Sequence, residues 1–217
     1  MLSIEQFRTA AEAELVNVAE GDNLDALSRA LIDLAVKASV TALDVRALDE
    51  AMSSALDTGA SPTQIQEIIS LASGLGVHSL MVSARRLAEL AAERGDPLLK
   101  EPLDADRQAL WDRYIGDDPY WVAFERDVPG FLDALIRLSP VQFRAFHDYC
   151  AVPWKSGSVR ALTKELAALA TDATPTHRYM PGFRMHLRNA LKLGAGQRAI
   201  RETLAIAAAA PEHRGVA

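Results

Sequence analysis

The chain has 217 residues, of which 49% are hydrophobic and 24% are charged. This composition is typical of globular proteins and excludes wholesale disorder. A formal net charge of −6 argues against a nucleic-acid binder, which needs a broad basic face. The single cysteine, Cys150, excludes an internal disulfide, a paired-thiol redox centre and a cysteine-rich zinc site.

The N-terminal sequence MLSIEQFRTAAEAEL lacks the basic start and apolar core of a signal peptide. The chain also contains no run of about 18 uncharged apolar residues, the length that a membrane-spanning helix needs. We therefore expect a cytoplasmic protein that has no membrane partner.

Apolar residues recur at helical spacing along most of the chain, which predicts an all-α fold. Ser61 can cap a helix whose first residue is Pro62, and Gln64 stands where a capping-box side chain reaches back. Alternating β-branched residues are missing, so no strand is expected. The helices predicted for the first part of the chain cover residues 4–19, 23–40, 43–56, 61–73 and 77–93.

Residues 95–130 differ because four prolines interrupt them and only one short helix, over 105–114, is predicted. Of the 13 aromatic residues of the chain, 12 lie at or after Trp111, which indicates either a bulkier core or the wall of a ligand pocket. The connector is therefore expected to be shaped rather than flexible. Further helices are predicted over 130–138, 140–151, 159–171, 181–193 and 197–209.

An offset of 135 residues aligns 30–81 with 165–216 without a gap and gives 13 identities in 52 positions. Matching apolar helix faces explain some identities, but the shared turn Gly59-Ala60 and Gly194-Ala195 is harder to ascribe to chance. The pattern predicts a duplicated helical unit. The copies differ in polarity: the second has Glu165, His177, Tyr179, Arg184 and His186 where the first has Ala30, Ala42, Asp44, Asp49 and Ala51.

The stretch GFRMHLRNALKLGA, preceded by KELAALA and followed by an IRETLAIA helix, resembles carboxymuconolactone decarboxylase. That family belongs to an all-helical superfamily shared with the AhpD-type alkylhydroperoxidases. The first-copy stretch ALDTGASPTQIQEIISLASGLGVHS resembles the same unit. The resemblance implies a degenerate AhpD-like repeat at 1–94, a connector at 95–138 and a carboxymuconolactone decarboxylase-like repeat at 139–217.

The resemblance also narrows the expected activity. The peroxidase branch uses a CxxC pair shortly before the histidine, whereas RYMPGFRMH contains no cysteine. The implied function is a lyase, a decarboxylase of a small carboxylated lactone or ring-cleavage product, which in that family needs no metal or organic cofactor. The alternatives are a non-catalytic helical assembly protein that binds a small organic acid, or an atypical alkylhydroperoxidase-like protein without the CxxC pair.

Six residues of the second copy are candidates for the site. His186, His177 and Glu165 are candidate acid–base residues, although a buried histidine or a helix-linking salt bridge would explain them equally. Arg184 is expected either to hold a substrate carboxylate or to pair with Glu165. Tyr179 and Trp154 are candidate substrate contacts, with packing as the alternative. The spacing of His177 and His186 does not suit a shared ion on one helix, so no metal is expected.

Alanine-rich helices such as 161–170 and 199–210 are apolar on more than one face. Such faces indicate either a central position in a monomeric bundle or a contact between subunits. Single-repeat members of the resembled family form six-membered rings, so a tandem chain would rebuild a ring from three copies. A homo-oligomer, with a trimer favoured over a dimer, is therefore expected.

Overall fold

The computed structural model describes residues 2–42 and 44–213, and every regular element within those residues is a helix. The all-α prediction is confirmed. The chain forms two compact units, one made of residues 1–75 and 152–217 and the other of residues 76–151. The predicted halves, 1–94 and 139–217, thus share one unit for most of their length. This happens because helices from both halves bury their apolar faces against one another.

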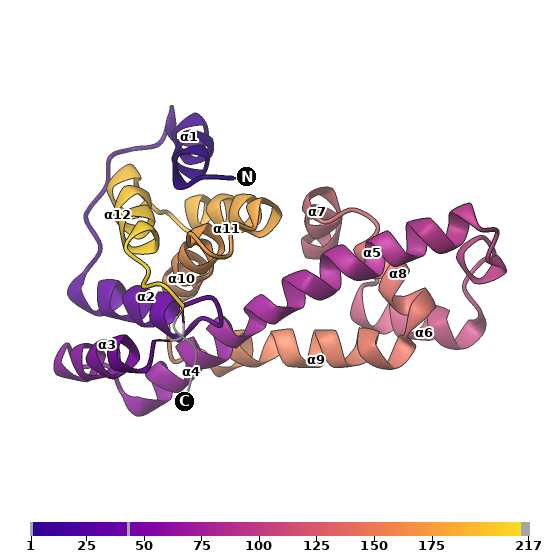
Figure 1. The fold of residues 1–217 in the computed structure, drawn as a ribbon, viewed down its shortest axis with the longest axis horizontal. Coiled ribbons are helices and arrows are strands. Elements are labelled where there is room, and N and C mark those ends of the chain that lie inside the picture. The colour runs from indigo at the N-terminus through magenta and orange to yellow at the C-terminus, as the bar shows by residue number, and fades with distance from the viewer. Residues whose placement is uncertain (1, 43, 214–217) are drawn as a thin grey trace. The chain divides into compact units, whose positions relative to one another are not determined.

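Among the described residues, the first unit contains seven complete helices, and α10 lies at its centre (Figure 1). Every residue of α10 from Thr163 to Ala173 is buried, and α2, α11 and α12 all pack against it. Small alanine side chains allow neighbouring helices to approach it closely. The bounds of these helices are α1 Ile4–Leu15, α2 Ala26–Ala38, α3 Val45–Asp57, α4 Pro62–Ser73, α10 Ala161–Ala173, α11 Met180–Lys192 and α12 Gln197–Ala208.

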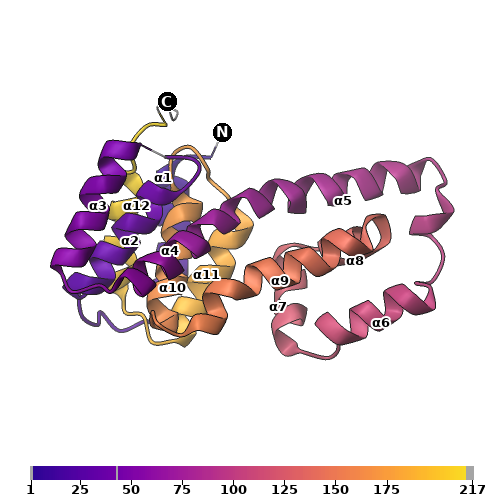
Figure 2. The same cartoon turned by 90° about the horizontal axis from the view of Figure 1, so that it is seen from below.

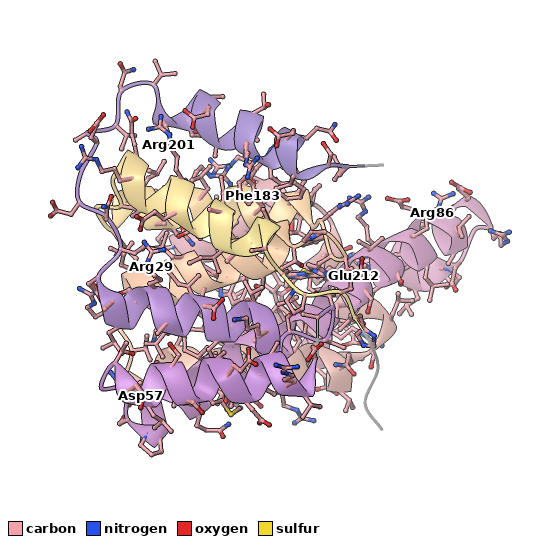
Figure 3. All side chains as sticks on the ribbon, turned by 60° about the vertical axis from the view of Figure 1, so that its left-hand side comes forward. Arg29, Asp57, Arg86, Phe183, Arg201 and Glu212 are labelled. Carbon is pink, nitrogen blue, oxygen red and sulfur yellow. The ribbon has the colours of Figure 1, made fainter. Side chains whose placement is uncertain are left out.

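Helix α1 covers α11 and α12 and closes one side of the unit. Its Phe7 meets Phe183 of α11 edge to face, with ring centroids 4.9 Å apart. Arg201 of α12 donates to Glu12 of α1 through Nε at 2.8 Å and Nη2 at 2.9 Å. Phe183 and Arg201 are labelled in Figure 3, where both lie beneath the ribbon of α1. The helix that bears the decarboxylase-like motif is therefore held from outside by the N-terminus of the chain.

Two helix triplets of the first unit correspond in their bounds. Adding 135 to the limits of α2, α3 and α4 gives the limits of α10, α11 and α12. Ser28 of α2 and Thr163 of α10, which are themselves 135 residues apart, share a hydrogen bond of 3.1 Å between their hydroxyls. The duplication remains a prediction, and this correspondence supports it.

A buried ion pair joins the two triplets. Lys164 Nζ lies 2.7 Å from Glu67 Oε1, and both side chains are at least 97% buried, with exposures of 3% and 1%. Lys164 also donates to the carbonyl of Pro153 at 2.9 Å. At the positions offset by 135 residues, Arg29 and Glu202 form a pair of the same length, 2.7 Å, that is largely exposed on the arginine side. The two pairs differ chiefly in their access to water.

The second unit has an aromatic core. The imidazole of His147 lies 4.5–5.0 Å from four aromatic rings, measured between centroids. These rings belong to Tyr114, Trp121, Phe143 and Phe146. A bulkier core therefore explains most of the aromatic enrichment that begins at Trp111. The bounds in this unit are α5 Val77–Glu93, α6 Ala105–Tyr114, α7 Pro119–Asp127, α8 Phe131–Leu138 and α9 Pro140–Ser156, whose last turn belongs to the first unit.

Several predicted boundaries are corrected in this unit. The connector contains a second α-helix, α7, which begins at Pro119 with Asp118 as its cap, and a short 3-10 turn over Pro97–Leu99. Helix α9 continues past the predicted end at residue 151 because Pro153 is accommodated inside it. Figure 2 shows α6, α7 and α8 as separate short helices along this part of the chain.

The helical stretch Pro62–Glu93 is long and apolar enough to cross a membrane by length and composition alone, with a best mean hydropathy of 1.3. Core helices of soluble proteins meet the same criterion. Its first part, α4, buries Ile65, Ile68 and Ala72 in the first unit. The expectation of no membrane span therefore remains a prediction.

Candidate functional site

The site is built from α10, α11 and the loop between them. Glu165 and Asp172 lie seven residues apart on α10, so two turns of helix place them on one face. His186 and Asn189, three residues apart on α11, share the face that meets α10. The loop that carries His177 is anchored by Thr176, whose hydroxyl donates to the carbonyl of Thr41 at 2.8 Å.

Glu165 orients His186. The Nδ1–H of His186 donates to Glu165 Oε2 at 2.7 Å, and Asn189 Nδ2 donates to the other carboxylate oxygen at 3.2 Å. Burial lowers the pKa of His186, but the hydrogen bond and charge of Glu165, with the charge of Asp172, outweigh it and leave the pKa above 6.5. The bond at Nδ1 leaves Nε2 of the imidazole to face Asp172.

Asp172 lies between the two histidines. Its Oδ2 is 4.0 Å from His186 Nε2, its Oδ1 is 3.7 Å from His177 Nε2, and its side chain is 1% exposed. Burial raises the pKa of Asp172 to about 7, although the charge of His186 opposes the shift. Burial lowers the pKa of His177. The carboxyl therefore titrates close to neutrality, as acid–base catalysis requires, and the pKa values of the two flanking imidazoles are shifted in opposite directions.

Gly182 makes room for Asp172. A Cβ at position 182 would lie 2.4 Å from Asp172 Oδ2 and 2.9 Å from Cδ1 of the Tyr179 ring. Both distances are shorter than van der Waals contact. The buried carboxyl of Asp172 can therefore occupy this position because residue 182, in the first turn of α11, is glycine.

The corresponding place in the first triplet has no such array. The 135-residue offset puts Ala30, Lys37, Ala42 and Ala51 where the second triplet has Glu165, Asp172, His177 and His186. Of these four positions of the first triplet, Ala30 lines an open groove of about 530 Å³, together with residues such as Arg29 and Ser54. The polarity difference between the two halves is therefore a difference in acid–base groups.

The six predicted residues have different surroundings. Glu165, His186 and His177 come together around Asp172, and the Tyr179 ring lies 6.0 Å from the His177 ring. Lys164 Nζ lies over the Trp154 ring, 5.3 Å from the ring centroid, so Trp154 packs against the buried ion pair.

Arg184 is exposed, and the considered ion pair between Arg184 and Glu165 does not form. The physical reason is that Glu165 is already occupied by His186 and Asn189, on a different face of α11.

Sequence reasoning missed Asp172, Asn189 and Gly182. The seven-residue spacing of Glu165 and Asp172 was an available signal, because two carboxylates on one face of an alanine-rich, buried helix are unusual. The three-residue spacing of His186 and Asn189 was another. Nothing in the sequence marks Gly182, which lies in the first turn of α11. The expectation that the site holds no metal remains a prediction.

Comparison with known proteins agrees with the resemblance. The model of the carboxymuconolactone decarboxylase family matches residues 140–212. A crystal structure from Burkholderia xenovorans LB400, provisionally described as a gamma-carboxymuconolactone decarboxylase subunit, is 30% identical to this chain and has a TM-score of 0.70. The similarity covers 94% of this chain and 76% of that one. No curated protein matches the chain significantly.

Proposed function

The chain belongs to the carboxymuconolactone decarboxylase family, and from that premise we propose that it decarboxylates a small carboxylated lactone or ring-cleavage product. Membership supports a decarboxylase-like function at the level of the family. The observation that carries the proposal is a row of four side chains with little exposure to solvent: Glu165, His186, Asp172 and His177. The nitrogen–oxygen distances between successive members are 2.7, 4.0 and 3.7 Å.

The reaction would break the carbon–carbon bond to the departing carboxylate. Carbon dioxide leaves, and the electron pair passes to the conjugated carbonyl of the substrate. The resulting enolate then takes a proton at carbon. Because the substrate is its own electron acceptor, the protein needs to supply a proton donor, positive charge near the enolate oxygen and a site shielded from water. This chemistry requires neither a metal nor an organic cofactor.

We assign the proton donation to Asp172. With a pKa of about 7, its carboxyl is protonated in a large fraction of molecules at neutral pH. The imidazolium of His186, stabilised by Glu165, supplies the positive charge. His177 is the more exposed end of the array and returns the proton from solvent, in line with its lowered pKa. Glu165 and Asn189 act by positioning His186.

The thiol-peroxidase alternative finds no support in the surroundings of Cys150. Burial raises the pKa of its thiol to about 11, so the thiolate that peroxidase chemistry needs is scarce. Cys150 also belongs to the second unit, whereas the array belongs to the first. The alternative of a non-catalytic binder does not account for a buried carboxyl whose pKa is raised to about 7 between two histidines with shifted pKa values, an arrangement typical of catalytic sites.

The test is release of carbon dioxide from gamma-carboxymuconolactone by protein that has been dialysed against a chelator. We expect turnover without added metal or cofactor. Dependence on an added metal ion, or no release by correctly folded protein, would contradict the proposal.

A further inference from the structure

His147 of α9 is an ionisable side chain enclosed by the core of the second unit. It is 6% exposed. The four rings whose centroids lie 4.5–5.0 Å from its imidazole belong to Tyr114, Trp121, Phe143 and Phe146. Such surroundings favour an uncharged side chain, because an ion buried among them loses its hydration.

The hydrogen bonding of His147 fits the neutral imidazole. Its Nδ1 lies 2.8 Å from the carbonyl oxygen of Phe143. A carbonyl can only accept, so the proton of the neutral ring is on Nδ1. The other nitrogen, Nε2, is buried and has no hydrogen-bond partner among the described residues. A proton added to Nε2 would therefore create a buried N–H and a positive charge without an acceptor.

The charged groups around the imidazole do not compensate that charge. Asp148, the next residue on α9, is exposed, and the hydroxyl of Tyr114 on α6 donates to it at 3.3 Å. The guanidinium of Arg113, also on α6, lies 5.2 Å from the centroid of the Tyr114 ring and adds positive charge. The rings through which α7 and α8 meet the cluster, Trp121 and Phe131, do not ionise.

The two units therefore respond to acid in opposite senses. Burial lowers the pKa of His147, although the Phe143 carbonyl and the charge of Asp148 oppose the shift. Between that lowered pKa and 6.5 the unfolded state binds a proton that the folded state does not, so the second unit loses stability as the pH falls. The first unit gains stability as the pH falls, because the pKa values of Asp172 and His186 are raised.

We propose that His147 is an acid switch: its protonation below pH 6.5 opens the second unit while the first unit stays folded. The inference does not depend on the proposed function, because His147 lies outside the array. Residues 76–151 form a small unit. Small units bury a smaller share of their surface and have little stability to lose, so one buried charge has a large effect.

Hydrogen exchange measured by mass spectrometry on the full chain tests the two units separately. Protection factors correct for the effect of pH on the exchange chemistry itself. We expect those of residues 105–148 to fall by about fivefold or more between about pH 7.5 and 5.5, since one proton changes an equilibrium by up to about tenfold per pH unit. Protection factors over residues 161–192 should not fall.

His147→Phe keeps an aromatic ring in the cluster but cannot bind a proton. We therefore expect protection in the second unit of this variant not to change with pH. His213→Phe replaces an exposed histidine and is the matched control, which should behave as the wild type. An equal fall of protection in His147→Phe, no fall in the wild type, or equal losses in both units would overturn the inference.

The wild type offers a second measurement for the case in which His147→Phe does not fold. The carbon chemical shifts of the His147 imidazole in NMR spectra report its protonation directly. We expect a neutral ring with its proton on Nδ1 in the folded unit, and protonation that coincides with the loss of protection. A His147 that becomes protonated while protection of the second unit is unchanged would equally overturn the inference.

Discussion

A carboxyl buried beside two histidines makes stability depend on pH in an uncommon direction. The pKa of Asp172 rises from 3.8 to about 7 on folding, so between these values the folded state holds a proton that the unfolded state has released. Stability therefore falls as the pH rises from about 4 to 7, by at most about 1.4 kcal/mol per pH unit. His186 adds to this trend: with a raised pKa, its contribution is complete below 6.5 and is lost as the pH rises through its folded pKa.

Asp172→Asn should remove most of this dependence. The amide resembles the protonated carboxyl in shape but cannot ionise, so the variant should be more stable than the wild type at pH 8 and much less active. Urea unfolding at pH 5 and pH 8 measures the difference, with the exposed Asp49→Asn as control. A variant less stable than the wild type at pH 8 would show that the carboxylate is held by partners that favour its charge.

Gly182→Ala should disturb the same carboxyl by steric contact. The added methyl group would lie 2.4 Å from Asp172 Oδ2, so we expect a loss of about 1–3 kcal/mol in unfolding free energy and a sharp loss of turnover. Gly74→Ala is the matched control, because nothing lies within 4 Å of its Cβ position. Equal effects of the two substitutions in thermal unfolding would exclude a packing role for Gly182.

Cys150→Ser should leave turnover within about twofold of the wild type. Its thiol has a pKa of about 11 through burial and lies outside the unit that holds the array. Steady-state turnover rates of the wild type and of Cys150→Ser test this prediction. Loss of turnover in a folded serine variant would revive the thiol-based alternative.

At the scale of elements, two equivalent ion pairs provide a comparison within one chain. Burial raises the pKa of Glu67, but Lys164, Ser156 and the Ser158 N–H outweigh it and hold the pKa below its usual range. Lys164→Met would leave that carboxylate buried without its cation, so we expect a loss of about 3–5 kcal/mol. Arg29→Met breaks the solvent-exposed pair and should cost under about 1 kcal/mol. Chemical denaturation of both variants tests the contrast, and similar losses would contradict it.

The helices themselves were largely predictable from the sequence. The Ser61-Pro62 cap predicts the start of α4, and helix 77–93 has the limits that its apolar spacing predicts. Helix α7 was missed because Pro119 reads as an interruption, although proline is well suited to the first turn. The end of α9 was missed for the same reason at Pro153.

The site was only partly predictable. Polarity in an alanine-rich background identified Glu165, His177 and His186. Arg184 is exposed, and its role as a substrate contact stays a prediction, because local spacing does not say which face of the helix meets α10.

For the whole molecule, the structure removes one of the reasons for expecting an oligomer. Helix α10 is buried within its own unit, so its alanine-rich faces need no second chain. The trimer now rests on the resemblance and on apolar surface elsewhere in the first unit, such as Val45, Leu56 and Leu193. We still expect a mass near three chains by light scattering at micromolar concentration. A mass near one chain would exclude the ring.

The proposed function assigns a decarboxylation to the array around His186. The most direct measurement is the turnover number of His186→Ala relative to wild type in release of carbon dioxide from gamma-carboxymuconolactone. Acid–base and electrostatic catalysis of this kind contribute a factor of about 10² or more, so we predict a loss of at least that size with the fold intact by circular dichroism. A folded His186→Ala variant within about twofold of the wild-type rate would show that His186 does not take part in the reaction.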